Sequence, residues 1–264
     1  HLRNGISVHS KFRARVAAAA LAATALTACG GVETVSAPAT TPTSPATSTP
    51  TPRPTPTPSP VPARHSAGEV TTDARAGTTL LVERRLASLG YPTGTVDGVV
   101  SVRTRQALCA WRDLHGLSSS RAGLGPVLAS SILSASDSRW VSRANGLYIN
   151  KTCQVLIQVV NHRYRRIVWV STAMPGYTTP SGTGRVWRKW AGAHESSLYS
   201  DAWMFDSLYF RRDHPGIALH GSASNSLVHS YPASHGCVRV WRPTIHSIFN
   251  ETPIGTRVVV YGSY

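Results

Sequence analysis

A cysteine and two histidines near the C-terminus have the residue types and the spacing that acyl transfer needs. Cys237 directly follows His235 and Gly236, and His220 lies 237 − 220 = 17 positions earlier, after the apolar stretch 217–219. A thiolate attacks a carbonyl when an imidazole takes the thiol proton and backbone amides donate hydrogen bonds to the oxyanion that forms. Glycine permits the tight turn and the close backbone approach that such amides require. The pattern therefore predicts an acyl-transfer site.

The segment that carries these residues alternates apolar and polar side chains from Asn145 onward. This period of two is typical of β-strands, and it includes Leu147, Ile149, Val155, Ile157, Val159, Ile167 and Trp169 before the closing run 258–261. Only Pro243 to about Asn250 has helical periodicity, with the proline suited to a first turn. We predict a mostly β domain in which a strand end holds His220 and a turn holds Cys237.

Between Thr78 and Leu133 the apolar spacing is helical. Leu81, Arg85 and Leu89 lie four positions apart, and a glycine-rich turn at 90–98 separates them from a second helical pattern. We predict a small α-helical domain over 78–135, followed by the β domain. The fold class is then α+β overall.

Residues 1–28 have the layout of an export signal. Four basic residues precede an apolar run, 16–26, which is shorter than the roughly 20 residues that a bilayer span needs. The Leu-Thr-Ala-Cys sequence that ends at Cys29 resembles a bacterial lipoprotein box, which implies lipid on Cys29. Ordinary secretion is the alternative. We expect an exported lipoprotein on the outer face of the cytoplasmic membrane that reaches the cell wall.

Residues 29–77 are predicted to be the lipidated cysteine and a linker. Thr, Pro, Ser and Ala dominate from Glu33 to about Arg64, with proline at nearly every second position from Pro50 to Pro62. Such a stretch stays extended, and its 64 − 33 + 1 = 32 residues would reach about 100 Å as polyproline helix. We interpret it as a tether.

The charge balance is strongly basic. The formal net charge is +15, and without the four basic residues before Cys29 it is 23 − 12 = +11. This excess favours an anionic partner. Nucleic acid is a poor candidate, because an exported protein would not meet it and the basic residues form no dense run. An anionic cell-envelope polymer fits better, although solubility alone would also explain most of the arginines.

The remaining cysteines, Cys109 and Cys153, predict a disulfide. Outside the cytoplasm such a leftover pair tends to be oxidised, and this bridge would close a loop of 153 − 109 = 44 positions. We predict that it ties the two domains together. Two buried free thiols are the alternative, since connectivity cannot be read from sequence.

The C-terminal segment resembles the YkuD-type L,D-transpeptidases. The similarity lies in the order His-Gly, a loop, then Ser-His-Gly-Cys-Val-Arg, and in a Thr-Pro-Ser-Gly turn at 179–182; it extends over about 145–262. It implies an L,D-transpeptidase-like β-sandwich as the catalytic domain. The segment 211–215 is commonly shorter in that family, so the rim of the site is expected to differ.

The resemblance implies a role for each residue of the motif. Cys237 is the nucleophile and His220 the general acid and base, while the carbonyl of Gly221 orients the imidazole. The amides of His235, Gly236 and Cys237 form the oxyanion hole, each donor typically contributing about 3 kcal/mol.

The resemblance also implies the reaction. Cys237 attacks the amide between the diamino acid at stem position three and the terminal D-Ala of a peptidoglycan tetrapeptide. The resulting thioester is taken by the side-chain amine of a second stem, which gives a 3-3 cross-link. No metal or other cofactor is required, and carbapenem-type β-lactams are expected to acylate the thiol.

Four further residues are candidates for substrate binding. Arg239 either braces the loop or meets a substrate carboxylate, since a guanidinium serves both roles. Ser234 lies in the motif itself. Tyr209 and Phe210, together with Trp203, could wall the stem peptide, although such aromatic residues are more often core. Trp187, Trp190 and His194 are a candidate flap by position alone.

The helical segment resembles the small three-helix peptidoglycan-binding domain. The similarity rests on Leu86–Tyr91, Val96-Asp97-Gly98, Ala107-Leu108 and His115-Gly116-Leu117, and departs at Trp111-Arg112, where the family usually has Phe-Gln. A helical spacer that binds nothing is the alternative.

Three other functions are weighed against the transpeptidase. A zinc hydrolase would use some of His214, His220, His229, His235 and Cys237, but only Asp213 is near as a carboxylate base. A non-catalytic peptidoglycan-binding lipoprotein would keep the tether and a degenerate catalytic fold. An L,D-carboxypeptidase would let water take the thioester.

Overall fold

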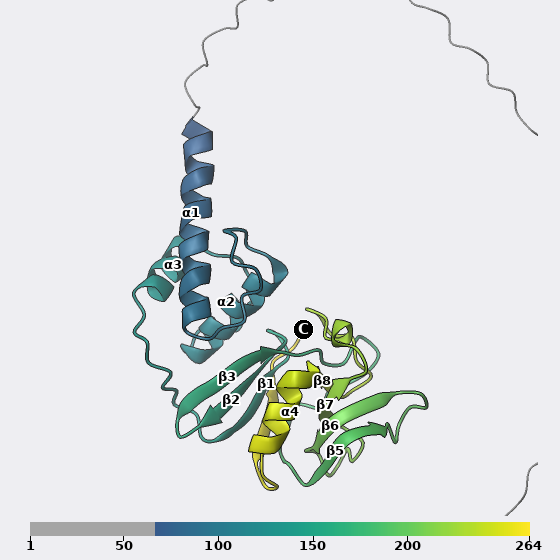
Figure 1. Cartoon of the computed structure of the whole chain (residues 1–264). Coiled ribbons are helices and arrows are strands. Elements are labelled where there is room, and N and C mark those ends of the chain that lie inside the picture. Colours follow the sequence, from purple (N-terminus) through teal and green to yellow (C-terminus); the bar gives the residue numbers. More distant parts are fainter. Residues whose placement is uncertain (1–66) are drawn as a thin grey trace, which may run out of the picture. The chain divides into compact units, whose positions relative to one another are not determined.

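The computed structural model describes residues 67–264, with side chains from Arg75 onward. The predicted export signal, Cys29 and the proline-rich tether lie outside the described residues. Three helices come first: α1 (Ala67–Ser88), α2 (Val102–Leu114) and α3 (Pro126–Leu133) (Figure 1). Helix α1 begins within the segment predicted to be linker, because the chain contains no proline between Pro62 and Pro92.

Local signals explain where these helices begin. Ser101 caps α2, since its hydroxyl accepts from the Thr104 amide while the Thr104 hydroxyl accepts from the Ser101 amide. Pro126 occupies the first turn of α3. Between α1 and α2, the buried carboxylate of Glu83 accepts the Gly98 amide at 2.9 Å and the Thr104 hydroxyl at 2.8 Å, which fastens the turn to both helices. No helix within 67–264 is long and apolar enough to span a membrane.

Nine strands form two sheets in the described residues. The first sheet has the order β3-β2-β1-β9-β4 and the second β5-β6-β7-β8. Their bounds are β1 (Gly146–Asn150), β2 (Val155–Val160), β3 (Arg163–Trp169), β4 (Gly182–Arg185), β5 (Arg188–Glu195), β6 (Trp203–Tyr209), β7 (Ala218–Ser222), β8 (Val238–Val240) and β9 (Arg257–Tyr261). Helix α4 (Arg242–Glu251) packs against β6 and β7. The prediction of a mostly β domain with one late helix is confirmed.

The alternation in the strands fills two cores. Leu147 and Ile149 of β1 point into a core shared with the second sheet and with Ile245 of α4, whereas Tyr148 belongs to a second core with Leu108 and other residues of the helices. Because both faces of the first sheet are covered, every residue of β1 is buried.

A disulfide joins α2 to the turn between β1 and β2. Cys109 and Cys153 are bonded at 2.00 Å, with their Cα atoms 5.4 Å apart. This is the pairing that the sequence predicted. In the chain-entropy account, closing a loop of this length stabilises the fold by about 4 kcal/mol.

Candidate active site

Cys237 lies in a turn immediately before β8, and that turn requires glycine. Gly236 has φ +136°, outside the range that other residues usually adopt. A Cβ at this position would lie 2.7 Å from Cδ1 of Ile217 and 3.3 Å from the Thr178 carbonyl oxygen. The glycine before Cys237 is therefore needed for this backbone conformation, and a side chain at position 236 would also require Ile217 to move.

Two hydroxyl groups hold the turn from either side. Ser234 Oγ donates to the Cys237 carbonyl at 2.5 Å and accepts from the Gly236 amide at 3.2 Å. Thr179, in the Thr-Pro-Ser-Gly turn, donates to the Gly236 carbonyl at 2.8 Å. Ser234, predicted to bind substrate, thus has its hydroxyl engaged with the backbone of the turn.

The side chain of Cys237 is half-buried. Its Sγ lies 3.4 Å from the Ala218 amide and 3.6 Å from the Gly216 carbonyl oxygen, which accepts the thiol proton. Burial raises the pKa of the Cys237 thiol, and the Ala218 amide and the Arg239 cation offset only part of that rise. Within the described residues, no hydrogen bond joins Cys237 to His220. The resting group is a neutral thiol.

His220 is held on β7 in one tautomer. Its Nδ1 lies 2.8 Å from the Gly221 carbonyl oxygen, which can only accept. Nδ1 therefore carries the proton and Nε2 keeps its lone pair. Burial lowers the pKa of His220 to about 4; the bond to Gly221 opposes this change, while Arg239 and His194 add to it. The imidazole is neutral at pH 7 and can act as a base.

Gly221 has a steric reason to be glycine. A Cβ there would lie 2.9 Å from Cγ2 of Ile245 and 3.0 Å from Cγ of Arg242. The close packing of α4 on β7 thus fixes the backbone whose carbonyl orients His220.

The predicted oxyanion donors divide into two groups. The Gly236 amide already donates to Ser234 Oγ. The amides of His235 and Cys237 donate to no acceptor within residues 67–264, so these two remain able to receive an oxyanion.

Cys237 and His220 both line a cavity of about 150 Å³. Its lining comes from the β5–β6 connection and the start of β6, from β7 and the segment after it, and from the turn before β8 and β8 itself: Ser196, Tyr199, Asp201, Ala202, Trp203, Met204, His220, Ser222, Ala223, Leu227, Ser234, His235, Cys237 and Arg239. The parallel pairing of β7 with β8, which sets Leu219 beside Val238 and His220 beside Arg239, explains why the two motifs meet.

Arg239 braces the loop, which is the first of the two roles that the sequence left open, and it also lines the cavity. Its Nη1 donates to the Ala233 carbonyl at 3.0 Å, which braces the loop, and its side chain also lines the cavity. The cation opposes the rise in the pKa of the thiol and lowers the pKa of His220.

The predicted aromatic wall is placed differently. Phe210 is buried in the core between the sheets and lines no part of this cavity. Tyr209 is buried beside Met204 and Ala218, and its hydroxyl lies 3.3 Å from Nε2 of His194. Phe210 directly follows the last residue of β6, and successive side chains of an extended chain point to opposite faces, so Tyr209 and Phe210 enter different buried clusters. Trp203, at the start of β6, does line the cavity and is half exposed.

Sequence reasoning missed Tyr199 and Leu227. Tyr199, in the β5–β6 connection, donates through its hydroxyl to the His235 carbonyl at 3.2 Å, and its ring packs on the His235 imidazole. The predicted flap residues Trp187, Trp190 and His194 do not line the cavity; the next turn along the chain does. The available signal was an aromatic residue, Tyr199, in a stretch rich in serine between two apolar segments.

The arrangement can carry out acyl transfer. It has a thiol, a neutral imidazole with an accepting Nε2 and two amides without acceptors around one cavity. Three or more His, Cys, Asp or Glu side chains placed to hold a metal ion do not occur together in the described part of the chain.

Comparison with known proteins gives a consistent result. Residues 144–260 match the family model of the L,D-transpeptidase catalytic domain. A crystal structure of an L,D-transpeptidase from Xylanimonas cellulosilytica is 30% identical, covering 69% of this chain and 92% of that one, with a TM-score of 0.48. An L,D-transpeptidase from Stackebrandtia nassauensis is 24% identical, covering 70% and 91% of the two chains, with a TM-score of 0.44.

A third solved structure is of a complex. L,D-transpeptidase 3 from Mycobacterium tuberculosis, in complex with a faropenem-derived adduct, is 16% identical over 44% of this chain and 59% of that one, with a TM-score of 0.39. No curated protein matches this chain.

Proposed function

This chain belongs to the L,D-transpeptidase family, a group of peptidoglycan acyltransferases, and we propose that Cys237 is its nucleophile and that the product is a 3-3 cross-link. One observation carries the proposal. His220 presents an accepting Nε2 to the cavity that Cys237 lines, because its Nδ1 proton is held by the Gly221 carbonyl.

The first step forms a thioester and releases D-Ala. Sγ of Cys237 attacks the carbonyl of the third stem residue while Nε2 of His220 takes the thiol proton. The amides of His235 and Cys237 donate hydrogen bonds to the oxyanion. Collapse of this tetrahedral adduct breaks the C–N bond, and the departing amine of D-Ala takes the proton back from His220.

The second step transfers the acyl group to another stem. The side-chain amine of its third residue attacks the thioester and gives a proton to Nε2 of His220. The C–S bond breaks, and the sulfur leaves with that proton. One amide has replaced another, the thiol is restored, and no cofactor is consumed.

The directions of the two pKa shifts favour proton transfer during attack over a preformed ion pair. A raised pKa of Cys237 and a lowered pKa of His220 keep both groups neutral at rest. Thiolate forms only as the carbonyl is attacked, when the amides stabilise the new charge. A thiol that stays protonated until the carbonyl is attacked resists oxidation outside the cytoplasm.

The test is intact-protein mass spectrometry with the wild type and Cys237→Ala. Each is incubated with a carbapenem and, separately, with disaccharide-tetrapeptide. We expect a covalent adduct on the wild type only, and a dimer that lacks one D-Ala. Folded wild type that gives neither adduct nor D-Ala release would instead support a non-catalytic wall-binding lipoprotein. Release of D-Ala with a monomeric tripeptide product would support an L,D-carboxypeptidase.

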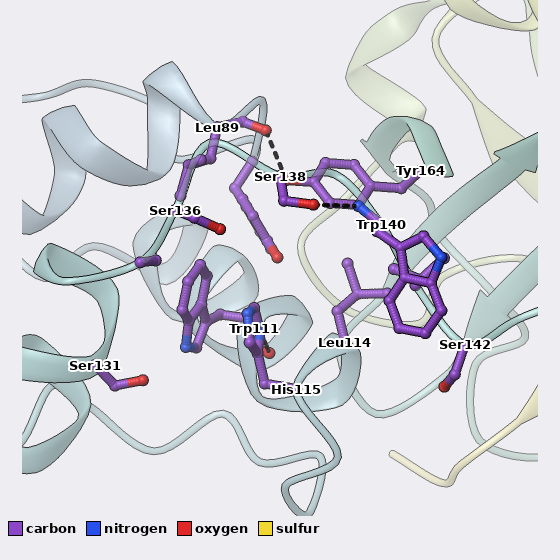
Figure 2. A pocket seen from close by; sticks show the side chains of 13 residues that line it. Leu89, Trp111, Leu114, His115, Ser131, Ser136, Ser138, Trp140, Ser142 and Tyr164 are labelled. Carbon is purple, nitrogen blue, oxygen red and sulfur yellow. Dashed lines mark hydrogen bonds between the residues drawn. The ribbon is translucent and has the colours of Figure 1, made fainter. Parts of the chain in front are cut away.

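We further propose that the helical segment binds peptidoglycan glycan. A cavity of about 400 Å³ lies against the helices, and its lining combines rings with hydroxyl groups (Figure 2). The Trp111 and His115 rings stack at 3.7 Å, and Trp140 is 63% exposed. Ser131, Ser136, Ser138 and Ser142 also line the cavity. Indole faces and hydroxyl groups are the partners that sugar rings require.

Sedimentation with purified sacculi tests this role. In a Cys237→Ala background, Trp140→Ala is expected to reduce the sedimented fraction, because the exposed indole is lost. Trp241→Ala, at a partly exposed indole away from this cavity, is the matched control. Equal sedimentation of all three proteins would favour the helical spacer.

We also propose that lipid on Cys29 holds the enzyme at the outer face of the cytoplasmic membrane, with the proline-rich tether reaching the wall. The support is the sequence of the first 64 residues. Cells fed labelled palmitate should label the wild type and leave Cys29→Ala unlabelled and released to the medium. Unlabelled wild type would indicate ordinary secretion.

A further inference from the structure

A buried amide on α2 faces the turn between β1 and β2. Gln106 is fully buried, and its Nε2 donates to the carbonyls of Cys153 at 3.2 Å and Gln154 at 3.1 Å. Both protons of the amide are used, so the helix is fastened to the backbone of that turn.

Gln154 continues the connection with its own side chain. Its Nε2 donates to Thr172 Oγ1 at 2.7 Å, and its Oε1 accepts from the Thr172 amide at 2.9 Å. Gln154 is fully buried and has φ +54°, a conformation that only surrounding contacts maintain. These two bonds leave Thr172 little freedom to rotate or to shift.

Thr172 in turn holds the start of the turn 234–237, which contains Cys237 and is called the nucleophile turn below. Its carbonyl accepts the amides of Ala233 and Ser234, each at 2.9 Å, and the next segment adds a bond from the Met174 amide to the Ser234 carbonyl, also at 2.9 Å. Ser234 then donates to the Cys237 carbonyl. A continuous series of hydrogen bonds therefore runs from α2 to Cys237.

The same helix also holds the chain that enters this turn. Arg103 donates through Nη1 to Gln106 Oε1 at 3.0 Å and through Nη2 to the Val228 carbonyl at 2.9 Å. Arg121, beyond α2, donates to the Ser230 carbonyl at 2.9 Å. Hydrogen bonds therefore connect the helical segment both to the chain that leads to Cys237 and to Thr172, which holds the start of that turn.

The disulfide reinforces the first link of this series. Cys109 follows Gln106 by three positions on α2, so both side chains share a face of the helix. Their partners, Cys153 and the Gln154 carbonyl, are consecutive in the turn. A covalent bond thus keeps Gln106 in register with the backbone it contacts.

We propose that Gln106 is a positioning residue for Cys237 and acts through Gln154 and Thr172. This inference rests on the proposed role of Cys237 as nucleophile. The helical segment then has a part in catalysis that is separate from any binding to the wall. A nucleophile displaced by a fraction of an ångström loses rate without losing the cavity that binds substrate.

The test separates binding from chemistry. Full-length wild type and Gln106→Met, which keeps the side-chain volume and the helix propensity, are mixed with a carbapenem in a stopped-flow instrument. The inhibitor dependence gives a dissociation constant and an acylation rate constant. We expect the rate constant to fall about tenfold, with the dissociation constant changed by less than about twofold.

Arg112→Ala is the matched control. Arg112 lies on the same helix and donates to the carbonyls of Ser120, Ala122 and Gly123. Its loss removes as many hydrogen bonds but none in the path through Gln154 and Thr172; the segment that it holds meets the approach to Cys237 through Arg121 instead. Its acylation rate constant should equal that of the wild type, and unfolding midpoints report the cost to stability in each variant.

A double-mutant cycle tests the path itself. If Gln106 acts through Gln154, then Gln106→Met should add almost nothing to Gln154→Met, while it should add its full effect to Arg112→Ala. Thr172→Val, which removes only the Oγ1 acceptor, should lower the same acylation rate constant. If Gln106→Met does not fold, this variant provides the test.

The outcomes are distinct. Wild type that forms no acyl-enzyme overturns the proposed function and this inference with it. Wild type that acylates, with Gln106→Met and Thr172→Val within twofold of it, overturns this inference alone. Equal losses in Gln106→Met and Arg112→Ala would also overturn it, because general destabilisation would explain both.

Discussion

The hydroxyl of Thr179 donates to the carbonyl of Gly236 at 2.8 Å, across 57 positions of sequence. The same oxygen accepts from the Ala173 amide at 3.0 Å. One side chain therefore ties the Thr-Pro-Ser-Gly turn to the nucleophile turn and to the segment beneath it. The two sequence motifs form a single structural unit.

Thr179→Val should slow the acylation of Cys237. The valine keeps the shape but leaves the Gly236 carbonyl and the Ala173 amide without partners, which costs about 1 to 3 kcal/mol of stability. We expect an acylation rate constant about tenfold lower, measured by carbapenem stopped flow. Thr179→Ser retains the hydroxyl and should stay close to the wild type. A serine variant as slow as the valine variant would contradict this role for the hydroxyl.

The lowered pKa of His220 should make the fold sensitive to acid. Above pH 6.5 the imidazole is neutral in both states, so it adds no pH dependence. As pH falls from 6.5 to about 4, the unfolded chain takes up a proton that the folded state excludes. This site alone should reduce the free energy of unfolding by about 3 kcal/mol, with no further loss below pH 4.

Urea unfolding at pH 7 and pH 4 measures this loss. Carboxylates also titrate in this range, so the relevant quantity is the difference between the wild type and His220→Asn, which lacks the imidazole. The variant should lose about 3 kcal/mol less than the wild type. Equal losses would show that His220 takes up its proton in the folded state near its ordinary pKa.

The raised pKa of Cys237 should be visible in its alkylation. In a Cys29→Ala protein, Cys237 is the free thiol, because Cys109 and Cys153 are bonded to each other. The rate of reaction with iodoacetamide should still be rising at pH values above the ordinary thiol pKa of about 8.5. A plateau already reached at pH 7 would instead indicate a preformed thiolate–imidazolium pair.

Gly236→Ala should damage both stability and activity. Its φ of +136° is strained for any residue with a Cβ, and the 2.7 Å approach to Cδ1 of Ile217 means that this side chain must move to admit a methyl group. Gly176→Ala is the control, because Gly176 also has a positive φ, +87°, but a Cβ there would meet nothing within 4 Å. Thermal unfolding should show a loss of about 1 kcal/mol for the control and about 2 to 3 kcal/mol more for Gly236→Ala.

Gly236→Ala, the variant with the larger loss of stability, should also lose acylation, whereas Gly176→Ala should keep it. If the two variants were equally stable, the tight packing around Gly236 would not be the reason for the glycine.

Some expectations from sequence depended on interactions close together in the chain, and these agree with the structure. Strand alternation predicted the β domain, and the late helix was expected at 243–250 and is found at Arg242–Glu251. The start of α1 at Ala67 was not predicted. The composition shows where the proline-rich stretch ends, but it does not show how close to that point a helix begins.

The substrate-wall prediction failed at Phe210 for a different reason. Successive side chains of an extended chain point to opposite faces, and Phe210, one position past the end of β6, points into the core that the two sheets share. Tyr199 was missed for the converse reason, since its place beside His235 depends on how the β5–β6 connection folds back. Neither burial nor pairing is visible in a single sequence.

The sequence by itself determined the candidate reactive residues and the elements that carry them, because Cys237, the glycine before it and the His-Gly pair are local patterns with local physical requirements. Only the tertiary structure decided that Ser234 clamps the turn, that the Gly236 amide is already engaged, and that Gln106 is connected to Cys237. Those facts depend on distances between residues far apart in the chain, which strand register and helix packing set.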